Sequence, residues 1–274
     1  MAELEKRVVV ALCQGHAQNG DVGFNLEKMK REIMRAASDK AEMILFPELF
    51  LSGYRVPAEE MRTVAEEKSG PSFQELSKVA KQANIAVLYG YPEVDRSSGS
   101  DILYNSAQLI AKDGRSLINY RKTHVWICPE PPQYEAVFTP GSNFQEPVEC
   151  CGVKIGILIC MDLAFPECAR CLAVAGAEFI AVLTASTDKW RSYHKTTAPV
   201  RAMDSSVYIA SVNHVRGGFE RGSICCDPDG GVVSSGSESE EELLLTTVIV
   251  PFKPRYNTIR SRRPELYKGL IEDL

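Results

Sequence analysis

GILICMDLAFPE, residues 156–167, contains an apolar run that stops on Cys160, close to the start of a helix-like segment. The pattern predicts a buried strand over Val153–Ile159 and a helix over Pro166–Ala175. A cysteine on a sharp strand-to-helix turn presents its sulfur at the edge of a sheet. It also leaves the next backbone N–H, that of Met161, free to bind an oxyanion. Taken alone, Cys160 is read equally well as a buried core cysteine.

Two other short strands also end on reactive residues. Met43–Phe46 is an apolar run cut off by Pro47, and Glu48 follows among apolar neighbours that should raise the pKa of its carboxyl toward the range of a general base. The strand Arg115–Tyr120 is followed by Lys122, a compact ammonium suited to holding a developing negative charge. Either charge alone is read more simply as a solvated surface group. Together, a thiol, a carboxylate and an ammonium at strand ends are the components of acyl transfer.

The rest of the chain alternates strands and helices, with tight hairpins between some strands. Asp113-Gly114 between two apolar runs is one such hairpin signal. A mixed sheet covered by helices is therefore favoured over a purely parallel one. Strands are expected at 7–14, 43–46, 85–91, 104–111, 115–120, 153–159, 178–184 and 207–213, with antiparallel strands over 222–234 and 243–250 and an exposed turn over 234–242 between them. Helices are expected at about 24–38, after a capping box of Ser72 and Glu75, at 166–175 and at about 190–202.

The composition is that of an ordinary globular protein, with 45% hydrophobic and 24% charged residues, and no linker divides it, so one domain over 1–274 is expected. A formal net charge of −5 argues against a nucleic-acid partner. No apolar run reaches the roughly eighteen residues of a membrane span, and a signal peptide is not recognisable. Nine cysteines, an odd number, predict reduced thiols and a cytoplasmic location. Cys168-x-x-Cys171 lacks a second pair at zinc-ribbon spacing, so no metal is expected.

Three motifs, in the right order, resemble those of the nitrilase superfamily of carbon–nitrogen hydrolases. FPELFLSGY carries Glu48, YRKTH carries Lys122 and GILICMDLAFPE carries Cys160, with weaker similarities in YNSAQLI, FTPG, PVRAMDSSVYIASVN and RRPELY. The resemblance implies a four-layer α–β–β–α sandwich that forms a homodimer, with about 252–274 at the dimer interface, and no metal or organic cofactor. It implies that Cys160 is the nucleophile and Glu48 the general base. Lys122 and the backbone N–H of Met161 would stabilise the tetrahedral intermediate.

Many members carry a second catalytic glutamate, usually four residues before the aromatic residue of the F-x-P-G segment. In this chain that position is Tyr134, and Glu135 lies one residue closer to Phe138. A one-residue deletion would bring Glu135 into place, so Glu135 is the preferred second glutamate. Glu130 is the alternative.

The reaction type follows from the residues after the nucleophile. True nitrilases tend to carry Cys-Trp-Glu, whereas Cys160-Met161-Asp162 is closer to the Cys-Tyr-Asp of amidases and carbamoylases. Hydrolysis of a small linear amide to carboxylate and ammonia is therefore expected, with N-carbamoyl hydrolysis as the alternative and nitrile hydrolysis less favoured. A papain-like protease would need a histidine partner in a local signature, which none of the four histidines has. A catalytically silent scaffold should have lost one of the three groups.

Substrate choice is expected to depend on loops that follow the sheet strands. Two such stretches are 126–134, which is rich in proline, and 186–193. Arg121, Lys189 and Arg191 could each bind an acidic substrate, although any of them could equally be a solvated surface charge. His124 is expected at the edge of the pocket, beside Lys122.

Overall fold

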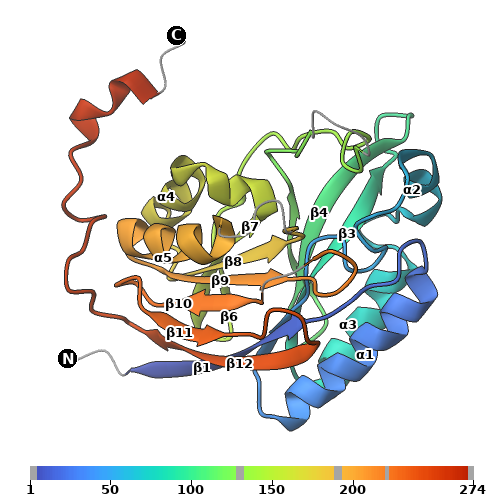
Figure 1. Ribbon diagram of the computed structural model, residues 1–274, viewed down its shortest axis with the longest axis horizontal. Coiled ribbons are helices and arrows are strands. Elements are labelled where there is room, and N and C mark those ends of the chain that lie inside the picture. Colours follow the sequence, from blue (N-terminus) through green and yellow to red (C-terminus); the bar gives the residue numbers. More distant parts are fainter. Residues whose placement is uncertain (1–4, 128–132, 188–192, 220–221, 271–274) are drawn as a thin grey trace.

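Two six-stranded sheets lie face to face, and helices cover the outer face of each sheet (Figure 1). The structure is a computed structural model, and it describes residues 5–127, 133–187, 193–219 and 222–270. In spatial order the first sheet comprises β12 (Glu242–Val250), β1 (Lys6–Gln14), β2 (Met43–Leu45), β3 (Ala86–Asp95), β4 (Ile102–Ile110) and β5 (Ser116–Arg121). The second comprises β11 (Val232–Ser235), β10 (Ile224–Cys226), β9 (Tyr208–Asn213), β8 (Phe179–Thr184), β7 (Val153–Ile159) and β6 (Val148–Cys150).

Both sheets are mixed, as the alternation of elements predicts. The central strands β1, β2 and β3 are parallel, and so are β7, β8 and β9. Antiparallel strands complete each sheet on either side. Because parallel strands end at the same edge of a sheet, the loops after β2 and β7 can place side chains in one region.

Three apolar cores separate the layers and account for the stacking. Along β1, Val8, Val10 and Leu12 face the second sheet, whereas Ala11 and Cys13 face the helices, which is the alternation expected of a strand. Each fully buried aliphatic side chain of this kind contributes roughly 1.5–3 kcal/mol. The first sheet is covered by α1 (Val22–Ser38) and α3 (Pro71–Ala83), and the second by α4 (Pro166–Val174) and α5 (Tyr193–Ser205). The predicted α–β–β–α sandwich is therefore confirmed.

The capping box predicted at Ser72 and Glu75 is wrong. The helix α3 begins at Pro71, and its N-cap is Gly70, which has no side chain to form a cap. Proline at the first helical position has a backbone angle that suits a helix start, so Ser72 lies inside the first turn. Its hydroxyl donates instead to Glu66 Oε1 at 2.7 Å. The short helices α2 (Ala58–Val64) and η1 (Cys160–Ala164) were not predicted from the sequence.

The segment after β12 runs away from the two sheets along the outside of the molecule (Figure 1). It contains two short 3₁₀ helices, η3 (Pro264–Leu266) and η4 (Lys268–Leu270). Its exposed apolar side chains include Tyr256, Leu266 and Leu270. Its predicted place at a dimer interface remains a prediction. Among the described helices, none has the length and apolar character needed to cross a membrane.

Candidate active site

Lys122 lies between two carboxylates in a fully buried cluster. Its Nζ is 2.6 Å from Glu48 Oε1, 2.7 Å from Glu135 Oε2 and 2.9 Å from Glu135 Oε1. The side chains of all three residues are inaccessible to solvent. The structure thus brings Glu135 into the cluster, and the alternative, Glu130, lies outside the described residues. The carboxylates raise the pKa of Lys122 above its usual range, although burial alone acts in the opposite direction.

The loop that carries Glu48 is held tightly against the neighbouring strand. β2 ends at Leu45, and the residues after it pack on Gly90 of β3. A Cβ atom at Gly90 would lie 2.5 Å from Leu49 N and 2.7 Å from Pro47 O, so only glycine permits this approach. From the other sheet, His214 Nε2 donates a hydrogen bond of 2.6 Å to the backbone carbonyl of Glu48. The backbone of Glu48 is therefore fixed from two sides.

The Glu48 carboxylate has one occupied oxygen and one open oxygen. Oε1 accepts from Lys122 and also from Asn105 Nδ2, at 2.8 Å. Oε2 is buried and has no hydrogen-bond partner among the described residues. Burial raises the pKa of Glu48 to about 7, with Lys122 opposing the rise and Glu135 adding to it. Near neutral pH this carboxyl can therefore both accept and give up a proton.

Cys160 lies at the junction of β7 and η1, on the strand-to-helix turn that the sequence predicts. Its backbone φ is +43°, an angle that residues with a side chain rarely adopt, and the residue is partly exposed. Burial of the sulfur and the nearby charge of Glu48 raise the pKa of the thiol well above its usual range, against the opposing charge of Lys122. The resting thiol is therefore protonated and needs a base to become a nucleophile.

Asp162 ties the turn of Cys160 to the strand of Lys122. Its buried carboxylate accepts hydrogen bonds from Ile159 N at 2.9 Å and Tyr120 Oη at 2.7 Å. Thr123 Oγ1 and the backbone N–H of His124 donate at 2.9 and 3.0 Å. These donors flank Cys160 on one segment and Lys122 on the other. One carboxylate thus sets the relative position of the two.

Replacing Asp162 by asparagine should lower the free energy of unfolding by ~3 kcal/mol, because the amide nitrogen would meet donors where the carboxylate now accepts. Urea unfolding followed by circular dichroism would measure the change. The control is Asp101→Asn, which alters an exposed ion pair with Arg96 and should cost less than ~0.5 kcal/mol. Equal losses in the two variants would contradict a special role for Asp162.

Several neighbours of the cluster were not predicted as site residues. Tyr54 donates to Glu135 Oε1 at 2.6 Å, and Asn105 binds Glu48 as described above. Both stand within motifs that the resemblance rests on, FPELFLSGY and YNSAQLI, which is a signal that could have identified them. His214 lies in no such motif, and only the meeting of the two sheets reveals its contact with Glu48.

Other candidate residues are placed outside the cluster. Arg121 points to the opposite face of β5 from Lys122, binds Glu93 and Asp95 and lies 3.8 Å over the ring of Tyr104, so it does not line this site. Lys189 and Arg191 lie outside the described residues. Cys168 is buried on α4 and Cys171 is exposed. Within the described ranges, no group of three or more His, Cys, Asp or Glu side chains is arranged to hold a metal ion.

His124 lies near the cluster but is bound to Asp162 rather than to Lys122. Its Nδ1 is 3.0 Å from Asp162 Oδ1, and its ring stacks on Phe165 with centroids 4.1 Å apart. About a third of its side chain is exposed, at 34%. It therefore belongs to the network that holds the turn.

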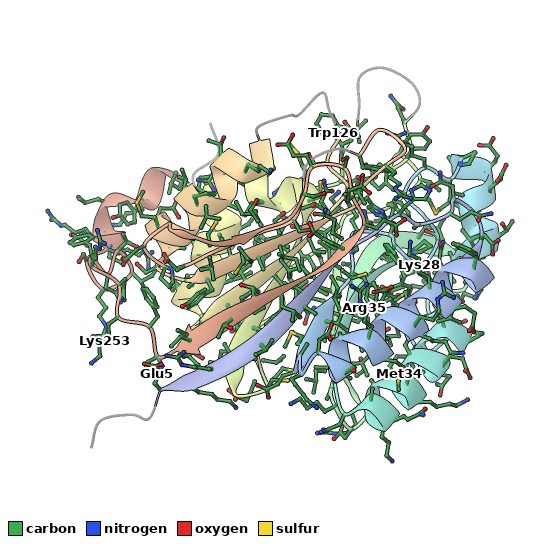
Figure 2. The ribbon with its side chains drawn as sticks, turned by 60° about the horizontal axis from the view of Figure 1, so that its bottom comes forward. Glu5, Lys28, Met34, Arg35, Trp126 and Lys253 are labelled. Atoms are coloured by element: carbon green, nitrogen blue, oxygen red, sulfur yellow. The ribbon has the colours of Figure 1, made fainter. Side chains whose placement is uncertain are left out.

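The loop after Lys122 is also fixed to the cluster. The backbone N–H of Trp126 donates to Glu135 Oε2 at 3.1 Å. Figure 2 shows Trp126 at one rim of the molecule, far from Glu5 near the start of β1. Of the two loops expected to shape the entrance, residues 128–132 and 188–192 lie outside the described residues.

Comparisons with known proteins identify the family of the chain. Residues 9–251 match the family described as carbon-nitrogen hydrolase. A protein named hydrolase in pqqF 5'region, from Pseudomonas protegens, is 40% identical over 209 residues, which are 76% of this chain and 70% of that protein. An (R)-stereoselective amidase from Pseudomonas sp is 34% identical over 229 residues, covering 82% and 79% of the two chains. An N-carbamoylputrescine amidase from Arabidopsis thaliana is 27% identical over 297 residues, covering 98% and 97%.

Solved structures give the same result. A mutant of the Nesterenkonia AN1 amidase from the nitrilase superfamily superposes with a TM-score of 0.82 at 26% identity, covering 96% of this chain and 97% of that one. In the structure of another mutant of that amidase, the acetamide moiety of fluoroacetamide is added covalently to the active-site cysteine. The chain therefore belongs to the carbon–nitrogen hydrolase family and is a hydrolase of the amidase-like branch of the nitrilase superfamily.

Proposed function

We propose that the protein hydrolyses a small linear amide to carboxylate and ammonia through a thioester on Cys160. The observation that carries the proposal is the open oxygen of Glu48. It belongs to a buried carboxyl with a pKa of about 7, and it lies near a thiol whose pKa is raised by burial and by the same carboxylate. A base with a pKa near neutral pH can take the proton of such a thiol and so activate it as a nucleophile.

In the first half of the reaction, Glu48 takes the thiol proton as the sulfur of Cys160 attacks the amide carbon. The carbonyl oxygen becomes an oxyanion, which Lys122 stabilises by its charge and Met161 by its backbone N–H. Glu48 then passes its proton to the amide nitrogen. The carbon–nitrogen bond breaks, ammonia leaves and a thioester remains on Cys160.

In the second half, water opens the thioester. Glu48 removes a proton from the water, a second oxyanion forms in the same place, and the proton returns to the sulfur as the carboxylate product leaves. Glu135 contributes by holding the Lys122 ammonium with both of its oxygens. Tyr54 in turn holds Glu135, so the positive charge is fixed before the substrate arrives.

Amides are favoured over nitriles because Met161-Asp162 follows Cys160, closer to the Tyr-Asp of amidases than to the Trp-Glu of nitrilases, and because the similar solved structures are those of an amidase. The second candidate is the N-carbamoyl bond, which has the same carbonyl–nitrogen geometry and which the similarity to an N-carbamoylputrescine amidase supports. Both reactions require the same groups, so the choice depends on the pocket that receives the substrate's tail.

Ammonia release from matched panels of aliphatic amides, N-carbamoyl amines and nitriles would test the proposal. We expect the fastest turnover with amides. Cys160→Ala serves as the blank for each substrate. Turnover of nitriles without turnover of amides would overturn the amide assignment, and ammonia release by folded Cys160→Ala would overturn the thioester.

Lys122→Met should lower kcat by about 10²–10³-fold, because a preorganised charge near the oxyanion is lost. The change also leaves Glu48 and Glu135 without their shared cation, so unfolding must be followed in parallel. The matched control is Arg121→Met, one residue away and on the opposite face of β5, which should leave kcat within about twofold. Similar losses of kcat in both variants would contradict the role of Lys122.

A further inference from the structure

Two pairs of adjacent cysteines occur in the sequence, Cys150-Cys151 and Cys225-Cys226. The two pairs differ in the directions of their side chains. Cys225 and Cys226 are neighbours within β10, so their side chains point to opposite faces. Cys225 lies in the core between the sheets and Cys226 in the core under α4 and α5. By contrast, the sulfurs of Cys150 and Cys151 are 3.8 Å apart.

A tight turn brings Cys150 and Cys151 together. Cys150 pairs with Val153 in the β6–β7 hairpin, and the two residues between them are Cys151 and Gly152. Both have positive φ, +55° and +78°, as in the two-residue type I′ turn. The left-handed conformation of Cys151 ends the strand alternation, so both thiols lie on the same side of the hairpin.

Cys150 is buried, so solvent reaches the pair from the side of Cys151, whose charged neighbours are Lys112, Lys6 and Glu42. Cys151 is partly exposed, and its thiol donates to the backbone carbonyl of Glu42 at 3.3 Å. The hydrogen bond from Cys150 lowers the pKa of Cys151 and burial opposes it. The charges of Lys112 and Lys6 lower this pKa, and the charge of Glu42 raises it. A low-pKa thiol beside a second thiol is a reactive arrangement.

Adjacent residues are poorly suited to a disulfide with each other. Their Cα atoms are about 3.8 Å apart across a trans peptide, below the roughly 4.4–6.8 Å that a relaxed disulfide spans. A single thiol-binding atom that bonds to both sulfurs can bridge their 3.8 Å separation without a sulfur–sulfur bond. A metal ion such as zinc would need further ligands, and the described residues provide no group of three.

We propose that Cys150 and Cys151 form a dithiol site that chelates a trivalent organic arsenical. With an arsine oxide, two arsenic–sulfur bonds form, the arsenic–oxygen bond breaks, and the two thiol protons leave with the oxygen as water. Arsenic remains trivalent, so no oxidant or reductant is needed. The site lies at the start of β7, whose seven residues separate it from Cys160 by roughly 20 Å.

The test is titration with phenylarsine oxide in excess glutathione, read by intact mass under native conditions. We expect one phenylarsine per chain, retained against glutathione, a monothiol, and removed by 2,3-dimercaptopropanol, a dithiol. Cys151→Gly should lose the adduct. Glycine suits the positive φ at this position, so the variant should fold with an unchanged circular dichroism spectrum.

Two further variants act as controls for other thiols. Cys171→Ser removes an exposed thiol near Cys168, and Cys160→Ser removes the proposed nucleophile. Both should keep the adduct. Retention of the adduct by Cys151→Gly, its loss in either control, or its removal by glutathione from the wild type would each overturn the proposal.

Discussion

Cys160→Ala should lower kcat for amide hydrolysis by about 10⁵–10⁶-fold, which is the scale of loss when the nucleophile of a cooperating catalytic set is removed. The reason lies in the geometry around the turn. Glu48 has an open oxygen and Lys122 a fixed charge, yet neither can form the acyl intermediate without the sulfur. Water attacking the amide directly would lose the positioning that the turn at Cys160 provides.

Steady-state ammonia release and covalent labelling together would check this prediction. Fluoroacetamide should add one acetamide group to Glu48→Gln, which cannot turn it over, and none to the double variant Glu48→Gln/Cys160→Ala. Cys171→Ala, which changes an exposed thiol on α4, is the matched control and should behave as the wild type does. A folded Cys160→Ala retaining more than about 1% of the wild-type kcat would show that the thioester is not on the path.

The strand ends that carry the site could be predicted because burial leaves a local pattern. Apolar runs that stop at Pro47 and at Cys160 correspond to β2 and β7, and the alternation along β5 explains why Arg121 and Lys122 face opposite ways. The predicted start of α3 was wrong because the helix begins at Pro71, one residue before the Ser72 that the capping-box pattern suggested as its cap.

The contacts of the site could not be predicted, because they join segments far apart in the chain. His214 meets the Glu48 carbonyl from the other sheet, 166 positions away. Asp162 was visible only as part of a motif, and its link to Tyr120 depends on how the two sheets pack. Gly90 gave no signal either, because its role is to leave room for another loop. Such contacts depend on the relative placement of two sheets, which hydrophobic periodicity does not encode.

Glu48→Gln should lower kcat by about 10³–10⁴-fold, because the amide cannot take the thiol proton or activate water. The wild-type kcat/KM should rise with pH and level off above about 7, since burial raises the pKa of Glu48 to about 7 and the base must be ionised. In Glu48→Gln this rise should disappear. The matched control is Glu93→Gln, a buried carboxylate bound to Arg121 outside the cluster, which should keep the wild-type pH profile. A pH rise that persists in Glu48→Gln would assign the base elsewhere.

The same ionisation that makes Glu48 a base should cost stability, and this gives the prediction a second readout. The pKa of Glu48 is raised on folding from 4.5 to about 7, so the folded state holds this proton more tightly than the unfolded state. Its favourable contribution is complete below about pH 4.5 and is lost as pH rises through about 7, a change of ~3 kcal/mol. Urea unfolding at pH 5 and pH 8 should therefore show a smaller fall in stability for Glu48→Gln than for the wild type. If the free energy of unfolding fell equally in both proteins, the ionisation of Glu48 would not be the cause of the loss of stability.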